Sequence, residues 1–389
     1  MEKNFATLSK LKLPKGATAL LRVDFNEQIT RGRAASDFRI TRALPTLSFL
    51  QKRALRIVLL THLEQHERTP SLCVLAERLR RYPPLRKLQF ISGTDRADIR
   101  RRIARSDAPV IMLENTRCFR GEEQNSAALA RFFAGLGDAF VFDAFAVAHR
   151  RHASVVGIAA LLPSYAGNLF CQEVRQLGQL FKPPRPFLLI LGGKKTTTKL
   201  PLLRAFQKKA DAVFIGGAAA NAFFARRGFS VGDSYVEHEA IGIISAALAQ
   251  SRRILLPEDV VVRRNKKRRT VRADEVGSHD EIMDIGPATV LQLGKRISES
   301  RAVLWNGPMG LVEGGFVSGT AGVAKAVRAL RGLRVVGGGD TVAFLHAHKL
   351  LSAFDFVSTG GGAMLDFLAD GTLPALEALA QSNRQFHPS

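Results

Sequence analysis

The chain has 389 residues, 46% of them hydrophobic, which is enough for two domains with buried cores. Lysine and arginine number 57 against 34 acidic residues, so the formal net charge is +23. Only three cysteines are present, which excludes a disulfide framework and fits a reducing compartment, so we expect a cytoplasmic protein. No stretch has the continuous apolar character of a signal peptide or a membrane span, so we expect no membrane association.

The first half of the chain alternates apolar runs with amphipathic stretches, which predicts an α/β fold. The predicted elements are strands at 19–25, 56–61, 110–113 and 139–142 and a helix at 39–52. Polar residues follow each strand: Asp24 and Asn26, then His62, then Glu114 and Arg117, then Asp143 with His149 and Arg150. Open parallel sheets bind ligands beyond the carboxyl ends of their strands, so these residues are candidates for one site.

The middle of the chain contains the predicted domain boundary. Residues 166–181 have the pattern of one helix, and the proline-rich segment 182–186 ends it. We therefore predict two doubly wound parallel-sheet domains joined by a hinge helix, with a cleft between them. The first comprises residues 1–165, the helix and linker 166–186 and the second 187–371; the tail from about 372 to 389 is expected to return to the first domain.

The second half of the chain carries four glycine turns, each directly after an apolar strand. They are Gly192-Gly193, Gly216-Gly217, Gly337-Gly338-Gly339 and Gly360-Gly361-Gly362. A single Gly-Gly pair is more often only a tight turn, but four of them predict a phosphate-binding cleft. The third runs into a helical segment with Asp340 or Thr341 as a potential N-cap, and an acidic residue beside phosphates indicates a divalent cation. The Walker A pattern is absent.

Basic residues cluster most densely at 263–272, where seven of ten residues are lysine or arginine and none is aromatic. A basic run can bind nucleic acid, but without aromatic platforms for stacking we expect a solvated surface. The run follows a predicted strand at 254–262. We therefore predict an exposed connection, with nucleic-acid binding that is at most non-specific.

Several motifs together resemble phosphoglycerate kinase over nearly the whole chain. In order they are Arg22–Asn26, Asp37–Ile40, Thr61–Leu63, Leu113–Asn115 with Arg117, Asp143–Phe145, Ala148–Arg150, Ile190–Gly193 with Lys195 and Lys199, Asp284–Pro287, Trp305–Gly310, Glu313, Gly337–Asp340 and Ser358–Gly362. The Trp-Asn-Gly-Pro-Met-Gly run is highly specific by itself.

The resemblance implies a reversible phosphoryl transfer between 1,3-bisphosphoglycerate and ADP that yields 3-phosphoglycerate and ATP, with Mg²⁺, in a monomer. It implies substrate binding by Asp24, Phe25, Asn26, Arg39, His62, Gln65, Arg117 and Arg150. It implies nucleotide binding by Gly193, Lys199, Gly216, Gly217, Gly286, Asn306, Glu313, Gly337, Gly338, Gly339, Asp340 and Thr341, with Asp340 also at the metal. Arg39, Lys195 and Lys199 would be catalytic, because transfer needs positioning and charge neutralisation rather than a protein nucleophile.

The sequence departs from the family pattern at five positions. Gln65 stands where the family has a substrate-binding arginine, Glu64 replaces a glycine, and Thr198 replaces an aspartate. At the other two, Ala146 and Ala218, a glycine is usual. The catalytic residues are retained, so an active enzyme is the first hypothesis. The alternative is a weakened or dual-role basic protein that uses the fold to bind nucleic acid or a partner. An assay of ATP consumption dependent on 3-phosphoglycerate separates the two.

Restoring the missing cation tests the first of these departures. We expect Gln65→Arg to lower the Michaelis constant (KM) for 3-phosphoglycerate, because a well-placed charge-assisted hydrogen bond contributes about 1.5–3 kcal/mol. Steady-state kinetics at saturating ATP measure the change. A KM that stays the same or rises would contradict a simple lost contact and would indicate that Glu64 competes for the same space.

Overall fold

The computed structural model describes residues 4–26, 29–30, 33–34, 37–65 and 69–387. His66 and the last two residues of the predicted tail lie outside this range. The chain forms two compact units: one comprises the residues up to Leu177 together with those from Thr372 onward, and the other comprises Gly178–Gly371. Each unit has a six-stranded sheet in which every strand pair is parallel, so the predicted α/β class is confirmed.

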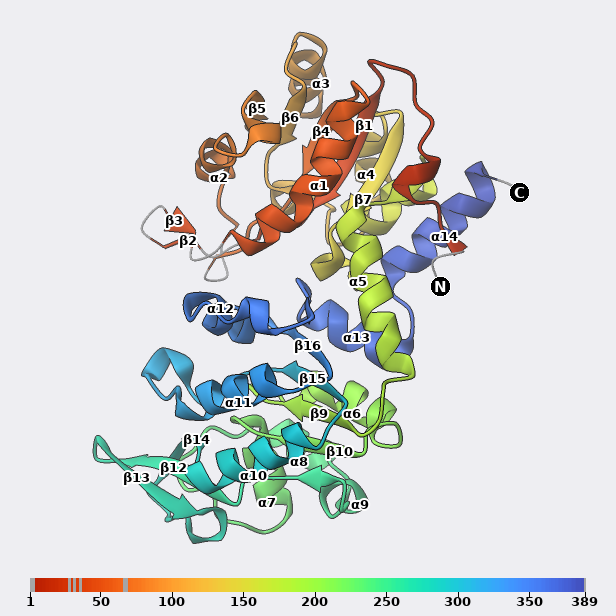
Figure 1. Cartoon of the computed structure of the whole chain (residues 1–389). Helices are drawn as coiled ribbons and strands as arrows, with labels where there is room; N and C mark the ends of the chain where they lie inside the picture. Colours follow the sequence, from red (N-terminus) through yellow and green to blue (C-terminus); the bar gives the residue numbers. More distant parts are fainter. Residues whose placement is uncertain (1–3, 27–28, 31–32, 35–36, 66–68, 388–389) are drawn as a thin grey trace. The chain divides into compact units, whose positions relative to one another are not determined.

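The sheet of the first unit has the strand order β5-β6-β4-β1-β7-β8 (Figure 1). The strands are β1 (Thr18–Val23), β4 (Arg56–Leu60), β5 (Leu88–Ile91), β6 (Val110–Leu113), β7 (Ala139–Asp143) and β8 (Ser164–Ala166), and a separate short pair is formed by β2 (Ile29–Thr30) and β3 (Arg33–Ala34). β4 and β7 pair with β1 on opposite sides, so the order in which strands are added to the sheet reverses at β1. In open parallel sheets, ligands bind at the carboxyl edge beside such a reversal.

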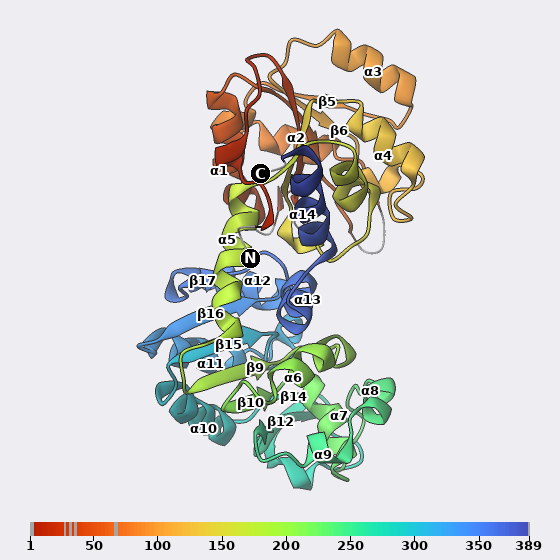
Figure 2. The same ribbon diagram turned by 90° about the vertical axis from the view of Figure 1, so that its right-hand side faces the viewer.

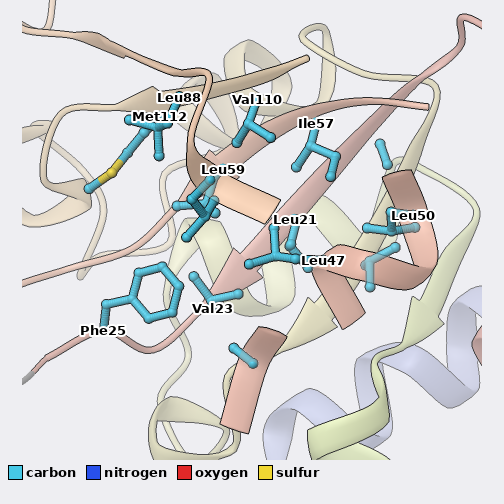
Figure 3. Packing of buried hydrophobic residues seen from close by; sticks show 14 of the residues in the cluster. Leu21, Val23, Phe25, Leu47, Leu50, Ile57, Leu59, Leu88, Val110 and Met112 are labelled. Carbon is cyan, nitrogen blue, oxygen red and sulfur yellow. The ribbon is translucent and has the colours of Figure 1, made fainter. Parts of the chain in front are cut away.

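Helices cover both faces of this sheet, with α1 on one face and α4 on the other (Figure 2). They are α1 (Phe38–Lys52), α2 (Cys73–Leu79), α3 (Arg96–Ala104), α4 (Ala127–Ala134), α5 (Asn168–Gly178) and α14 (Pro374–Phe386). Alternate residues of β1 and β4 pack against α1. Figure 3 shows Leu21, Val23 and Ile57 from the strands with Leu47 and Leu50 from the helix, all of them fully buried. Burial of both faces explains why these strands are apolar throughout.

The sheet of the second unit has the order β11-β10-β9-β15-β16-β17. The strands are β9 (Phe187–Leu191), β10 (Ala212–Ile215), β11 (Ile254–Leu255), β15 (Ala302–Asn306), β16 (Leu333–Gly337) and β17 (Phe356–Val357). The helices are α6 (Leu200–Phe206), α7 (Ala219–Arg226), α8 (His238–Ile243), α9 (Ala246–Ala249), α10 (Pro287–Ser298), α11 (Ser318–Ala329), α12 (Gly339–Ala347) and α13 (Gly362–Asp370). The direction reverses between β9 and β15, which is where this topology binds nucleotides.

Two glycine-containing turns interlock at this reversal. The Gly192 N–H donates to Asn306 O at 2.8 Å and the Gly193 N–H donates to Pro308 O at 2.7 Å. Gly307 has φ of +96°, and a Cβ there would lie 2.2 Å from the Gly192 carbonyl oxygen. Only glycine permits both the backbone conformation and this close approach, which fixes the carboxyl edge of the second unit's sheet.

Two predicted elements differ from the structure. The helix predicted at 166–181 is α5, Asn168–Gly178, which begins only after β8 has ended and continues as a single 3₁₀ turn, Gln179–Phe181. The strand predicted at 254–262 divides into β11 of the parallel sheet and β12 (Asp259–Arg264) of another sheet. Pro257 lies between the two, and a proline cannot donate a hydrogen bond to a strand ladder.

The basic run 263–272 is largely exposed, as predicted, but it forms a β-hairpin and not a simple connection, so that part of the prediction was wrong. β12 and β13 (Lys267–Arg272) pair antiparallel, and β14 (Glu281–Ile285) completes a three-stranded sheet. Asn265 and Lys266 form the turn with φ of +49° and +63°, the left-handed pair that a two-residue hairpin requires. β13 is an exposed edge strand, and charged side chains there discourage pairing with a second chain.

Most arginines of this hairpin already have partners within the second unit. The pairs are Arg263 with Glu281, Arg269 with Asp280, Arg272 with Asp274 and Glu275, and Arg268 with the Phe316 ring and the Gly315 carbonyl oxygen. A phosphate backbone would have to displace these contacts. The pairing therefore explains the basic run as part of the fold.

No helix within the described residues is long and apolar enough to cross a membrane.

Charge removal in this hairpin should separate two kinds of residue. We expect the triple variant Arg264→Gln, Lys266→Gln, Lys267→Gln to keep its stability and activity, because these exposed side chains cover no core. Arg269→Gln should lower the free energy of unfolding by about 1–3 kcal/mol, because the fully buried Asp280 side chain loses its ion-pair partner.

Chemical denaturation measures the free energy of unfolding, and anisotropy titrations with random-sequence duplex DNA measure nucleic-acid binding. Binding of nucleic acid should be weak and should vanish steeply with salt. Sequence-selective binding at physiological salt, or loss of activity in the triple variant, would contradict this account of the hairpin.

Candidate functional site

In the first unit, the residues predicted at the ends of β1 and β4 form one polar cluster. The Asp24 carboxylate accepts a hydrogen bond from Arg39 Nη1 at 2.6 Å, and the same nitrogen donates to Asn26 O at 3.2 Å. Asn26 Oδ1 accepts from the Glu64 N–H at 2.9 Å, which ties the two strand ends together. The pKa of Asp24 is lowered, because Arg39 and His62 outweigh the opposing effect of burial. Asp24 is therefore ionised and holds Arg39 in place.

His62 lies in this cluster as a neutral ring. Its Nδ1 is 3.6 Å from the Asp24 carboxylate and 3.5 Å from the Arg22 guanidinium. Burial lowers the pKa of His62 to about 3, and nearby arginines add to the effect against the attraction of Asp24. At neutral pH His62 can thus bind an anion only through a hydrogen bond and not through a positive charge.

A buried ionic network lies next to this cluster, and sequence analysis did not predict it. Arg22 is 1% exposed, and its Nε donates to Ser154 Oγ at 3.0 Å. The Ser154 hydroxyl in turn bonds to the buried Glu122 carboxylate. Burial lowers the pKa of Arg22 and raises that of Glu122, while their mutual attraction opposes both shifts. The available signal was a charged residue inside the apolar run Leu20–Val23, since a fully buried charge is rare without a partner.

Two further predicted substrate residues, Arg117 and Gln65, lie on loops beside this cluster. Arg117 is held by the 3₁₀ turn Thr116–Cys118, whose N-cap Asn115 accepts the Arg117 N–H at 3.1 Å. Its guanidinium forms ion pairs with Glu123 and Glu64. The Gln65 amide nitrogen is buried and has no hydrogen-bond partner among the described residues.

The remaining predictions for the first unit have different outcomes. Arg150 is close enough to His62 to lower its pKa, and no carboxylate of the described residues forms an ion pair with its guanidinium. Phe25 is fully buried in the core, so only its backbone can face a ligand (Figure 3). Asp143 lies apart from the cluster: its carboxylate accepts the Phe170 N–H at 2.9 Å at the start of α5, and burial raises its pKa to about 7.

The second unit contains a cavity of about 580 Å³ beside the interlocked glycine turns. Of the predicted nucleotide residues, Gly193, Gly217, Glu313 and Asp340 line it. An apolar slot that sequence analysis missed completes the wall, formed by Phe224, Tyr235, Met283, Ile285, Met309 and Leu311. Tyr235 and Leu311 are largely exposed hydrophobic side chains, which is the arrangement expected where a planar ligand stacks.

Lys199 is the buried cation nearest this cavity. It is 8% exposed, and its Nζ donates to Lys195 O at 2.7 Å. Burial lowers the pKa of Lys199 to about 8, although Glu237 and Asp340 attract its positive charge. Glu237, which sequence analysis missed, accepts the Thr197 N–H at 3.0 Å and so fixes the turn. Lys195 itself is exposed and free to reach outward.

The third glycine turn leads into α12 as predicted, but the N-cap is different. The helix begins at Gly339 with Gly338 as N-cap, so Asp340 and Thr341 lie in its first turn and do not cap it. Thr341 Oγ1 accepts the Gly307 N–H at 2.9 Å, which links this helix to the end of β15. Asn306 Nδ2 is buried beside Gly338 and has no partner among the described residues. Asn306 Nδ2 is therefore a donor that no described residue engages at the end of β15.

The other eight predicted nucleotide residues do not line the cavity, and Gly286 and Gly216 lie against its lining residues or their neighbours. Gly286 packs against Asp259, where a Cβ would lie 2.2 Å from the carboxylate carbon, and its N–H donates to Asp259 O at 2.8 Å. Asp259 also accepts the Thr289 N–H and so occupies the start of α10. Gly216 is buried against Met309 and Phe214. Both glycines shape the wall from behind.

The acidic residues at the cavity fit a divalent cation bound with nucleotide phosphates. The pKa of Asp340 is raised by burial and by the negative charge of Glu313, with Lys199 opposing the shift. Mg²⁺ commonly takes one or two protein carboxylates and fills its other positions with phosphate oxygens and water. A divalent cation would relieve the repulsion between Asp340 and Glu313.

Comparison with known proteins agrees with this geometry. A family model described as "Phosphoglycerate kinase" matches residues 8–371. The chain belongs to the phosphoglycerate kinase family. Relatives named phosphoglycerate kinase include one from Thermus thermophilus, 41% identical over 94% of this chain and 97% of its own, and one from Pelotomaculum thermopropionicum, 38% identical over 94% and 96%.

Solved structures of phosphoglycerate kinases share the fold. The enzyme from Coxiella burnetii has a TM-score of 0.79 at 34% identity and covers 97% of this chain and 99% of its own. The enzyme from Pyrococcus horikoshii has a TM-score of 0.88 at 28% identity, over 98% and 100%. The chain is therefore a phosphotransferase with the two-unit α/β architecture of this family.

The pKa of Lys199 predicts how nucleotide use depends on pH. Lys199 is charged below about pH 8 and neutral above it in the free protein. A neutral amine attracts phosphates less, so kcat/KM for MgATP should fall as pH rises through this value. Lys199→Arg should retain its charge and remove this fall. A profile that is the same in both proteins would contradict the role given to Lys199.

Proposed function

We propose that this chain transfers a phosphoryl group reversibly between the 1-carboxyl phosphate of 1,3-bisphosphoglycerate and ADP, giving 3-phosphoglycerate and ATP. The observation that carries the proposal is the complementary chemistry of the two strand-end sites. One presents Arg39, Arg117 and Arg150 with a neutral His62. The other joins an apolar slot to a glycine turn and a buried lysine.

The first of these sites suits the glycerate substrate. Arginine binds carboxylates and phosphates through a planar fork, and three arginines beside one histidine match a small anion with two charged ends. Asp24 orients Arg39 at 2.6 Å, so part of the cluster is arranged before substrate arrives. Such preorganisation reduces the cost of ordering during binding.

The second site suits a nucleotide. The apolar slot would accept a base and Glu313 would bind the ribose. The backbone of Gly193, with Lys199 beside it, would contact the phosphates. A bound Mg²⁺, held by Asp340, would neutralise phosphate charge. Lys195 would reach the group in flight, where an added positive charge stabilises the transition state more than the ground state.

Further features of the proposal follow from the family. We propose Mg²⁺ as the cofactor, a monomeric protein, a cytoplasmic location and hinge bending during the reaction cycle. Closure would exclude water, which limits wasteful hydrolysis. The alternative of a nucleic-acid-binding protein has less support, because the arginines of the basic hairpin already pair with Glu281, Asp280 and Asp274.

A coupled assay tests the proposal directly. Purified protein should consume ATP only when both 3-phosphoglycerate and Mg²⁺ are present, with NADH oxidation by glyceraldehyde-3-phosphate dehydrogenase as the signal. Omission of each component is the control. No consumption above the blank, in a protein shown to be folded by circular dichroism, would overturn the proposal.

Replacement of Lys195 tests the proposed catalytic role. Lys195→Ala should lower kcat by at least about 100-fold, because loss of a positive charge at the transferring group costs roughly 3 kcal/mol of transition-state stabilisation. The fold should be unaffected, since the side chain is exposed. Steady-state kinetics and thermal melting measure the two effects.

Lys208→Ala is the matched control, because Lys208 is another exposed lysine of the second unit. It should retain normal turnover. A Lys195→Ala enzyme with near-normal kcat would refute the catalytic assignment, whereas equal losses in both variants would indicate a general charge effect.

A further inference from the structure

Arg117, a proposed ligand of the glycerate substrate, is already occupied by two carboxylates of this chain. Its side chain is only 11% exposed, and its Nη1 forms an ion pair with Glu123. Its other terminal nitrogen, Nη2, lies 4.0 Å from Glu64 Oε2. Both ends of the guanidinium fork, which would grip a phosphate or a carboxylate, therefore face an acid.

The two acids differ from Arg117 in how freely they can move. The side chain of Glu64 is 46% exposed and that of Glu123 is 54% exposed. Exposed ion pairs contribute little net stability, because water and salt compete for both charges. An anionic ligand can thus displace these carboxylates while Arg117 stays in position.

The charge balance of the whole cluster gives these acids a larger effect. The cluster contains three arginines (Arg39, Arg117 and Arg150) and three carboxylates (Asp24, Glu64 and Glu123), with Asp24 paired to Arg39 and both glutamates paired to Arg117. His62 is neutral because burial lowers its pKa to about 3. Among the described residues the site is therefore close to electroneutral, although the chain as a whole carries +23. The attraction of an anionic substrate is correspondingly reduced.

We propose that Glu64 and Glu123 compete with the substrate anion for Arg117 and thereby lower its affinity. This inference rests on the proposed function, because it assigns the anion as 3-phosphoglycerate. Glu64 is placed for this role by backbone geometry, since its N–H donates to Asn26 Oδ1 at 2.9 Å inside the cluster. Substrate binding then exchanges two internal ion pairs for ligand contacts, and affinity is weaker than an unoccupied arginine would give.

Removal of each acid tests the competition. Glu64→Gln and Glu123→Gln should each lower KM for 3-phosphoglycerate by roughly two- to five-fold, the range expected for an exposed ion pair. The double variant should lower it further, and KM should change more than kcat. The gain should shrink in high salt, which screens exposed charges. Glu77→Gln is the matched control, because Glu77 is an exposed partner of Arg80 on the same unit.

The Arg117→Gln background separates competition at Arg117 from a general charge effect. In that background Glu64→Gln should change the dissociation constant for 3-phosphoglycerate little, as measured by titration calorimetry without nucleotide. An equal gain with and without Arg117 would overturn the inference, and so would unchanged KM and dissociation constant in both single variants. Tighter binding without any turnover would instead uphold the competition while refuting the proposed kinase activity.

Discussion

The structure depends on one constraint: every strand of a parallel sheet ends at the same edge. Residues that follow different strands are therefore neighbours in space although they are far apart in the chain. Asp24 and His62 meet because β1 and β4 are adjacent and parallel. Gly193 and Pro308 meet because β9 and β15 are adjacent and parallel. Both proposed ligand sites result from the same geometric rule.

Several basic side chains of this chain are paired with acidic side chains close by, which reduces the positive charge available to a ligand. The buried Arg22 has buried partners in Ser154 and Glu122, because an isolated charge in the core is too costly. The basic hairpin pairs its arginines with acids of its own unit. Much of the basic charge of this hairpin is therefore used in contacts within the fold.

The two units use their charges differently. In the first, Arg39 and Arg117 are held or occupied by carboxylates, so affinity for an anion depends on exchanging ion pairs. In the second, Lys199 is buried without a direct ion pair among the described residues, and its lowered pKa means that nucleotide phosphates would restore its charged form. The proposed glycerate site is thus nearly neutral before binding, whereas the proposed nucleotide site holds a buried lysine whose charged form a bound phosphate would stabilise.

The sequence by itself determined the fold class, most strand positions and the family, because apolar runs and glycine turns are local patterns. It also identified Asp24, Arg39 and Lys199 through motifs. It did not reveal the apolar slot, the hydrogen bond that Glu237 accepts from the Thr197 N–H, or the partners of Arg117. These residues are brought together only by packing. The helix start at Gly339 and the hairpin at 263–272 were decided by backbone conformation and edge pairing. Local patterns encode elements, whereas contacts between distant residues decide which charges are free to bind a ligand.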